Sequence, residues 1–156
     1  MKSLITGSGG FAGSHLAEHL QSQGEEVIGL VAPDEKPTLL KPPAGLTRIE
    51  RADLRDANQV AAILAEMRPD RIYHLAALSS PADSLQDPRS TFDVNFGGTL
   101  NILLGWRKAQ FDSRMLVVSS SDVYGTVQNE ELPLREDSAL RPANLSMLRK
   151  RLEALR

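Results

Sequence analysis

Three glycines near the start of the chain have the spacing of a phosphate-binding loop. Gly7, Gly10 and Gly13 lie in the run Thr6-Gly7-Ser8-Gly9-Gly10-Phe11-Ala12-Gly13, between a short apolar stretch and a segment with helical periodicity. The first glycine permits a tight turn, the second lets backbone approach a diphosphate, and the third allows close helix packing. The helix start adds N–H groups and a positive dipole end. We predict that Gly7, Gly10, Phe11 and Gly13 bind a dinucleotide; a merely glycine-rich turn is the alternative.

The sequence leaves open whether that dinucleotide is NAD or NADP. The usual fingerprint has an acidic group about 20 residues beyond the glycines for NAD, or an arginine nearby for the 2′-phosphate of NADP. The corresponding stretch here is Leu30-Val31-Ala32-Pro33 and contains neither. Asp34 or Lys36 could substitute. Both lie in a proline-flanked loop, where they are equally well explained as solvated charges.

Strands and helices alternate along the chain and would place this loop at the end of a strand in a sheet. We expect strands at 2–6, 27–31, 47–52, 71–77 and 114–119. Helical patterns begin near residues 11, 53 and 92. Such alternation implies parallel strands joined by right-handed crossovers. The predicted fold is therefore α/β, a three-layer, Rossmann-type doubly wound parallel sheet of about five strands, formed by one domain over residues 1–156.

Apolar stripes predict which helix faces pack on the sheet. The second helix has a stripe of Val60, Ile63, Leu64 and Met67, is capped by Asp53 or Asp56, and is stopped by Pro69. The third has Phe92, Phe96, Thr99 and Leu103 at spacings of four, three and four residues. These are the faces that we expect to be buried.

Composition excludes several other classes of function. The chain has 156 residues, a net charge of −2 and no cysteine, which argues against disulfides, thiolate catalysis and cysteine-based zinc sites. We expect no metal site. The lack of a basic block argues against nucleic-acid binding, and no apolar run approaches the ~20 residues of a membrane span. We expect a cytoplasmic protein that binds small ligands.

Five motifs in order resemble the extended short-chain dehydrogenase/reductase family, which includes NAD-dependent epimerases and dehydratases. They are the glycine loop, Ala52-Asp53-Leu54-Arg55-Asp56, His74-Leu75-Ala76-Ala77, Asn95-Phe96-Gly97-Gly98-Thr99 and Ser119-Ser120-Ser121-Asp122-Val123-Tyr124-Gly125. The resemblance runs from Met1 to about Lys150. Residues 119–142 are most similar to GDP-4-keto-6-deoxy-mannose reductases, with GDP-mannose 4,6-dehydratases second. It implies an NAD or NADP cofactor and a nucleotide-sugar substrate, here a GDP-sugar.

The resemblance also implies roles for two groups of cofactor-binding residues. Asp53 and Leu54 would flank the adenine, with the Asp53 carboxylate accepting from the exocyclic amine. From spacing alone, a helix cap fits Asp53 equally well. Leu75, Ala76 and Ala77 would form a wall that admits the pyrophosphate and the nicotinamide ribose. Plain strand core is the alternative for these three.

Histidines and one buried amide have plainer expected roles. His74 has a side chain that titrates near neutrality, but a lone histidine on an apolar strand is more often simply packed. Asn95 on the long helix needs hydrogen-bond partners if it is buried, and we expect it to be structural. His15 and His19 are expected on the surface of the first helix.

By the same resemblance, Ser119 and Lys150 contact the cofactor, and Ser120 orients the substrate oxygen. Lys150 would also take part in catalysis. Asp122 matches the place where dehydratases carry an extra acid, although a turn or cap role is equally plausible. The family has a tyrosine general acid/base four residues before the lysine, and Ser146 occupies that position. A serine hydroxyl has too high a pKa to deliver a proton there near neutral pH.

The chain ends where the family continues into a sixth strand and a substrate-binding domain. We therefore expect an NAD(P)-binding domain that is truncated relative to the family and catalytically impaired, with residues 145–156 as a leucine-rich helical cap. One alternative is an active GDP-sugar reductase or dehydratase completed by a partner chain. Another is a homodimer or assembly fragment, because an apolar edge at 115–118 can recruit another chain.

Overall fold

The computed structural model of the chain describes residues 1–34 and 45–141. Its strands are β1 (Lys2–Thr6), β2 (Glu26–Val31), β3 (Arg48–Arg51), β4 (Arg71–His74) and β5 (Arg114–Val117). Its α-helices are α1 (Phe11–Ser22), α2 (Ala57–Met67), α3 (Pro81–Gln86), α4 (Pro88–Phe92) and α5 (Gly98–Ala109). A π-helical turn, η1 (Asp93–Gly97), precedes α5, and two 3₁₀ turns, η2 (Ser121–Tyr124) and η3 (Asn129–Glu131), follow β5.

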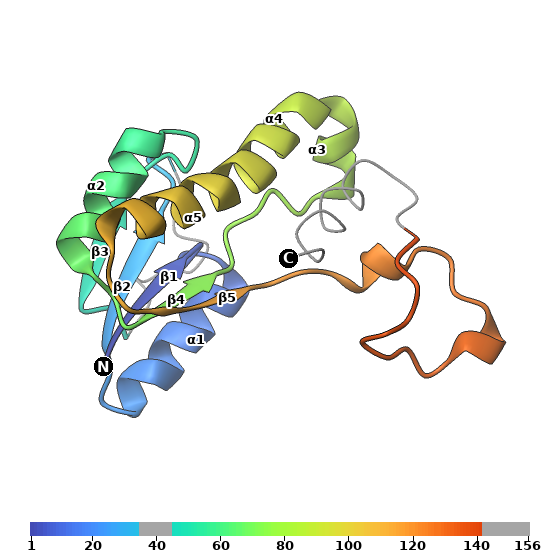
Figure 1. Ribbon diagram of the computed structural model, residues 1–156, viewed down its shortest axis with the longest axis horizontal. Coiled ribbons are helices and arrows are strands. Elements are labelled where there is room, and N and C mark those ends of the chain that lie inside the picture. Colours follow the sequence, from blue (N-terminus) through green and yellow to red (C-terminus); the bar gives the residue numbers. More distant parts are fainter. Residues whose placement is uncertain (35–44, 142–156) are drawn as a thin grey trace. The chain divides into compact units, whose positions relative to one another are not determined.

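The five strands form one parallel sheet in the order β3-β2-β1-β4-β5. Helix α1 covers one face of the sheet, and α2 and α5 lie together on the other (Figure 1). A right-handed crossover forces this division, because the step from β1 to β2 and the steps from β3 to β4 to β5 run in opposite directions. The three-layer, doubly wound architecture predicted from the sequence is confirmed.

Two apolar clusters fill the space between the sheet and its helices. On the α1 face, Ile5 and Val27 pack with Ala17 and Leu20. The cluster on the α2 and α5 face contains Leu4, Ile28, Leu30, Ala52, Leu54, Val60, Leu64, Met67, Ile72 and Ile102. Neighbouring residues such as Leu4 and Ile5 enter opposite clusters because side chains alternate along a strand. Both faces of β1 and β2 are therefore buried.

The limits of α2 follow from local chemistry. The Asp56 carboxylate accepts from the backbone amides of Asn58 and Gln59 at 3.0 and 3.1 Å, so Asp56 is the cap and Asp53 is not. The helix ends at Met67. Arg68, the residue after it, has a φ of 43° in the left-handed region, and Pro69 prevents the helix from continuing. The predicted stripe is largely right, since Val60, Leu64 and Met67 are buried.

The predicted face of the third helical segment is only partly right. Thr99 is buried as expected, but Phe92 is 44% exposed and Ile102 takes the central place in the core. The π-helical turn η1 explains the difference, because its wider turn shifts the phase of the residues on either side. A regular period of 3.6 residues therefore cannot describe 92–103 as one stripe.

The described chain divides into two compact units. Unit 1 comprises Met1–Leu78 and Asp93–Val118 and contains the whole sheet. Unit 2 comprises Ser79–Phe92 and Ser119–Arg156, of which residues after 141 are not described. Unit 1 carries the predicted cofactor residues up to Ala77, and unit 2 carries those from Ser119 onward. Lys36 and the expected helix at 145–156 lie outside the described residues.

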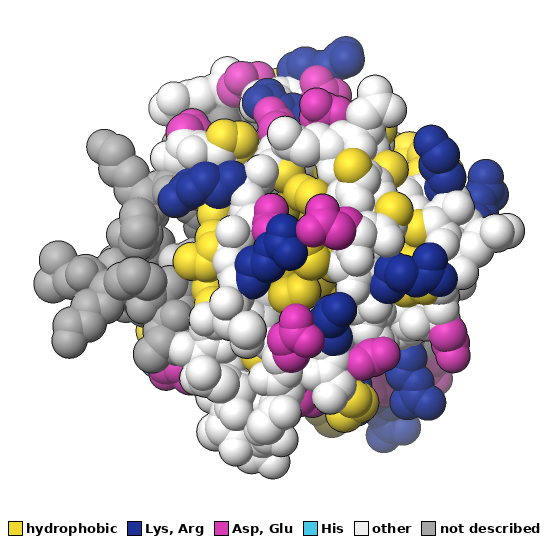
Figure 2. All heavy atoms as spheres, turned by 90° about the vertical axis from the view of Figure 1, so that its left-hand side faces the viewer, with side chains coloured by type: hydrophobic (Ala, Val, Ile, Leu, Met, Phe, Trp, Pro, Cys, Tyr) yellow, Lys and Arg dark blue, Asp and Glu magenta, His cyan; other side chains and the backbone are white. Residues whose placement is uncertain are grey.

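The edge of the sheet at β3 is covered by charged side chains. Arg48 pairs with Glu50 on its own strand and with Glu66 of α2. On the side of the molecule that contains β3, basic and acidic side chains alternate over a partly apolar surface (Figure 2). Charges of this kind oppose the pairing of an edge strand with another chain. No helix in the described ranges is long and apolar enough to span a bilayer.

Candidate functional site

The carboxyl ends of β1 and β4 form the centre of the candidate site. The chain leaves β1 for β2 on one side and reaches β4 and β5 on the other, so the strand order reverses between β1 and β4. Doubly wound sheets bind ligands in the crevice outside this reversal point. The glycine loop follows β1 there, and the segment Leu75–Ala77 follows β4.

Two of the three glycines are needed to close the loop. Gly7 has a φ of +70°, and a Cβ on it would lie 2.9 Å from the backbone of Ala76. Its amide donates to the Leu30 carbonyl at 2.8 Å, which ties the loop to the end of β2. A Cβ on Gly13 would lie 2.3 Å from the Gly7 carbonyl oxygen. Side chains at these positions would push the loop away from the sheet or the helix away from the loop.

Gly10 is different, because its environment is open. A Cβ there would meet only the Gly7 carbonyl oxygen, at 3.4 Å, and its φ of −77° suits any residue. Gly10 precedes the first residue of α1, no side chain caps the helix, and its first turn contains no acidic residue. The positive end of the α1 dipole is therefore available to an anion. The side chain of Phe11, 75% exposed, stands edge-on to the ring of His15 beside it.

A serine under the loop was not anticipated from the sequence. Ser8 is fully buried, and its hydroxyl has no hydrogen-bond partner among the described residues. It packs so close to Gly29 of β2 that a Cβ on that glycine would lie 2.4 Å from Ser8 Oγ. Gly29 therefore makes room for the loop from beneath. A glycine in an otherwise apolar strand was the available sequence signal for this close approach.

Asp53 lies directly after β3, with its carboxylate held by Arg55. The Arg55 Nε lies 3.0 Å from both carboxylate oxygens, and Nη2 lies 2.6 Å from Oδ2. The side-chain hydrogen bond from Arg55 is the main cause that lowers the pKa of Asp53 below its ordinary value. Leu54 beside it is buried in the core, against Gly98 of α5. Asp53 is thus a fixed, ionised acceptor near the ends of β2 and β3.

An arginine that sequence reasoning missed lies at the neighbouring corner. Arg51, the last residue of β3, donates from Nη1 to the carbonyl oxygens of Ala32 and Pro33 at 3.2 and 3.3 Å. Its guanidinium therefore lies at the end of β2, where the adenosine ribose is expected. The signal was hard to find, because Arg51 is on a different strand and about 20 residues beyond the corner in sequence.

Residues 75–77 do not belong to β4, which ends at His74. The predicted strand over 71–77 is three residues too long. Leu75 and Ala76 are half-buried and Ala77 is exposed, so this segment continues from the sheet along the candidate crevice. Asn95 holds the next residue: its Oδ1 accepts from the Leu78 amide at 2.7 Å and its Nδ2 donates to the Leu78 carbonyl at 3.0 Å. Asn95 has the partners that a buried amide requires.

In unit 2, Ser120 directly precedes the 3₁₀ turn η2 and caps it. Its Oγ accepts from the Asp122 amide at 3.3 Å, which leaves the hydroxyl hydrogen available to donate elsewhere. Asp122 is exposed in the first turn, and Ser119 is exposed before it. Tyr124 donates from its hydroxyl to the Arg135 carbonyl at 3.3 Å, a contact within the unit that gives it a structural role.

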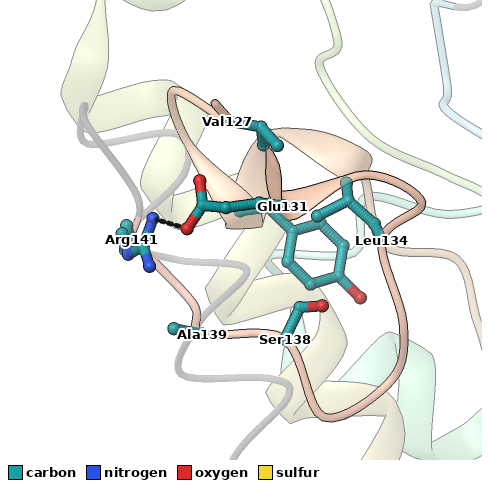
Figure 3. Close-up of a pocket in the computed structure, with 7 residues that line it drawn as sticks. Val127, Glu131, Leu134, Ser138, Ala139 and Arg141 are labelled. Atoms are coloured by element: carbon teal, nitrogen blue, oxygen red, sulfur yellow. Dashed lines mark ion pairs between the residues drawn. The ribbon is translucent and has the colours of Figure 1, made fainter. Parts of the chain in front are cut away.

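The same unit contains a hollow of about 200 Å³ that the sequence did not indicate. Its lining comprises Tyr124, Val127, Glu131, Leu134, Ser138, Ala139 and Arg141. Glu131 and Arg141 pair at 2.6 Å on one side of the hollow (Figure 3). The pKa of Glu131 is lowered, mainly by the hydrogen bond from the Gln128 amide and then by Arg141. The ion pair thus fixes the loop just before the last described residue.

A family profile described as GDP-mannose 4,6-dehydratase matches residues 4–145. The chain belongs to this family. The match includes the glycine loop, Asp53, the 75–77 segment and the Ser119–Asp122 stretch. The resemblance noted from the sequence motifs is confirmed.

Relatives of this family member are nucleotide-sugar enzymes. The GDP-mannose 4,6-dehydratase of Vibrio cholerae serotype O1 is 37% identical over 89% of this chain and 40% of its own length. The GDP-6-deoxy-D-mannose reductase of Pseudomonas aeruginosa is 31% identical over 90% of this chain and 41% of its own length. The solved Thermus thermophilus UDP-glucose 4-epimerase in complex with NAD has a TM-score of 0.84 and 33% identity, covering 96% of this chain and 47% of that one.

The chain thus spans less than half the length of these relatives. The tyrosine-to-serine position, Ser146, and the expected lysine, Lys150, lie outside the described residues. No cluster of three or more histidine or acidic side chains that could hold a metal ion occurs in the described ranges.

Proposed function

We propose that unit 1 binds NAD(H) or NADP(H) and is the coenzyme-binding part of a nucleotide-sugar epimerase, dehydratase or reductase. The contrast among the three glycines carries this proposal. Gly7 and Gly13 are closed in by backbone, whereas Gly10 has open space beside the uncapped start of α1. If the turn needed glycine only for steric reasons, Gly10 could be replaced by a residue with a side chain. The loop therefore fits a diphosphate that approaches the backbone.

The other predicted cofactor residues have roles consistent with this placement. The first amides of α1 would donate to the phosphates, with Phe11 shielding them. The ionised Asp53 would accept from the adenine amine beside Leu54. Leu75, Ala76 and Ala77 would line the path toward the nicotinamide ribose. When bound, the dinucleotide would supply hydride transfer, while these residues hold and orient it.

We propose that unit 2 supplies the substrate side of the same protein. Ser120 would donate its hydroxyl hydrogen to a sugar oxygen, because its lone pair already accepts from Asp122 N. Ser119 would contact the cofactor and Asp122 would serve as an extra acid. By the resemblance, Lys150 would contact the cofactor and take part in catalysis. With serine at position 146, we expect little proton transfer by this chain alone. The family and two relatives support a GDP-sugar as the substrate.

Calorimetric titration of the purified chain with NADH and with NADPH tests dinucleotide binding. Gly10→Val should fold normally, because its φ is ordinary and no atom lies closer than 3.4 Å to its Cβ position. It should nevertheless abolish binding, since the side chain occupies the space that the diphosphate needs.

Gly24→Ala is the matched control. Gly24 has a φ of +77° but no neighbour within 4 Å. It lies in the turn between α1 and β2, at the amino end of β2, whereas the glycine loop follows the carboxyl end of β1. This variant should lose about 1 kcal/mol of stability and keep full binding. If the wild type binds neither dinucleotide at millimolar concentration, the proposed function is wrong.

A further inference from the structure

A buried line of polar side chains joins β1 to the π-helical turn before α5. Its members are Thr6, His74, Thr99 and Asn95, all of them buried. Thr6 Oγ1 lies 2.7 Å from His74 Nδ1, and His74 Nε2 lies 2.9 Å from Thr99 Oγ1. Thr99 Oγ1 lies 2.7 Å from the Asn95 carbonyl oxygen. We call these four residues the buried relay.

If the His74 ring is neutral, the hydrogen bonds of the relay can point in only one direction. Thr99 has a single hydroxyl hydrogen and donates it to the Asn95 carbonyl, so it can only accept from His74. The proton of the neutral ring is therefore on Nε2, which makes Nδ1 an acceptor for the Thr6 hydroxyl. Thr6 Oγ1 in turn accepts from the Ala76 amide at 3.1 Å. In this arrangement the two threonine hydroxyl hydrogens and the ring proton of His74 each have an acceptor within the line.

Both ends of the relay hold the segment that follows β4. At one end, Thr6 accepts from the Ala76 amide; Ala76 is also the residue whose backbone packs against Gly7. At the other end, Asn95 holds Leu78 through both its amide and its carbonyl group. Residues 75–78 are thus fixed from β1 on one side and from η1 on the other. This segment is the proposed wall of the dinucleotide site.

We propose that His74 is a positioning residue: its ring, neutral and protonated on Nε2, fixes the 75–78 segment against the glycine loop and so preorganises the dinucleotide site. This inference rests on the proposed function. It differs from packing, because an apolar ring of the same size would fill the space but leave Thr6 and Thr99 without their partner. Buried polar groups without partners are costly, so the segment would move to satisfy them.

Nitrogen NMR of the labelled full chain reads the tautomer directly. The His74 ring should show a protonated Nε2 and an unprotonated Nδ1, whereas the exposed His15 and His19 should show averaged tautomers. A proton on Nδ1 of His74, or averaging like that of the two exposed rings, would overturn the proposal.

Variants at Thr99 test whether the relay positions the site. Thr99→Val keeps the shape but removes the hydroxyl, and Thr99→Ser keeps the hydroxyl. We expect Thr99→Val to weaken dinucleotide binding about tenfold, ~1.4 kcal/mol, and to speed amide exchange at Ala76 and Leu78. Thr99→Ser should restore both. His74→Phe should behave like Thr99→Val.

Val60→Ala is the control for general destabilisation. Val60 is buried in α2 on the same face of the sheet, and its apolar side chain takes no part in the hydrogen bonds of the relay. It should lower the thermal midpoint without changing affinity or the exchange of Ala76 and Leu78. If Thr99→Val binds like the wild type, or if Val60→Ala weakens binding equally, the positioning role is wrong while the proposed function stands. If the wild type itself binds no dinucleotide, both fail together.

Discussion

At the residue scale, we expect the charge at the end of β2 to decide which dinucleotide this chain prefers. The sequence offered Asp34 and Lys36 for this role, and Lys36 lies outside the described residues. The structure adds Arg51, held by the Ala32 and Pro33 carbonyls. Asp53 does not oppose it, because Arg55 already neutralises that carboxylate. Arg51 therefore holds a guanidinium at the described end of β2, where we expect the 2′ group of the dinucleotide.

We therefore predict a preference for NADPH over NADH that depends on Arg51. Arg51→Ala should weaken NADPH binding by about tenfold to a hundredfold, which corresponds to the ~1.5–3 kcal/mol of a hydrogen bond to a charged group, and leave NADH nearly unchanged. Calorimetric titration of both cofactors measures this. Arg48→Ala is the control, because Arg48 is on the same strand but pairs with Glu50 and Glu66. Equal losses for both cofactors would show that Arg51 only ties β3 to the end of β2.

At the element scale, the glycine loop is a joint among β1, α1 and the end of β4. Each glycine solves a different steric problem. Gly7 reverses the chain against Ala76, Gly13 brings α1 onto the Gly7 carbonyl, and Gly29 makes space for Ser8 below. Gly10 alone is not required by packing. We therefore expect folding and dinucleotide binding to depend on different glycines of one motif.

Alanine at Gly13 and at Gly10 should separate these two demands. Gly13→Ala should cost about 1–3 kcal/mol of stability, because overpacking against backbone cannot be relieved by a rotamer change. Gly10→Ala should cost much less, since its Cβ meets nothing closer than 3.4 Å. Urea denaturation of both variants measures the difference. Equal losses of stability would mean that the loop relaxes around Gly13 and that its packing is not tight.

At the scale of the whole molecule, the two edges of the sheet differ in character. The β3 edge carries Arg48, Glu50 and Arg51. At β5, which pairs on one side only among the described residues, Leu116 and Val118 are 53% and 50% exposed. Beyond Arg114 at its start, this edge carries no charged side chain, and an apolar edge strand can pair with another chain.

We predict that this edge makes the 156-residue chain self-associate. Replacing both Leu116 and Val118 with lysine should raise the dissociation constant about tenfold or more, ~1.4 kcal/mol, because a lysine on an edge strand opposes pairing. Sedimentation velocity over a range of concentrations measures this. Ile49→Lys on β3, where Ile49 is 43% exposed, should change nothing. A wild type that stays monomeric at every concentration would contradict the prediction.

Sequence by itself determined the order of the elements, the parallel sheet and the place of the phosphate loop. These follow from short-range signals: apolar runs, a glycine spacing of three, and Pro69 after the second helix. Such signals are carried by neighbouring residues and do not need the fold. The roles of Asp53, the 75–77 segment and Ser120 were predicted through their motifs and not through geometry, and they stay predictions.

Only the tertiary structure decided how distant residues act on that loop. Arg51 reaches the end of β2 because β3 pairs beside it, and His74 joins Thr6 to Thr99 because β4 lies between β1 and α5. Asn95 accepts from the Leu78 amide and lies in the π-helical turn η1. This turn interrupts the 3.6-residue periodicity from which a helix is predicted. These contacts join residues 17 or more positions apart, so they depend on strand order and helix phase, and no local pattern encodes either one.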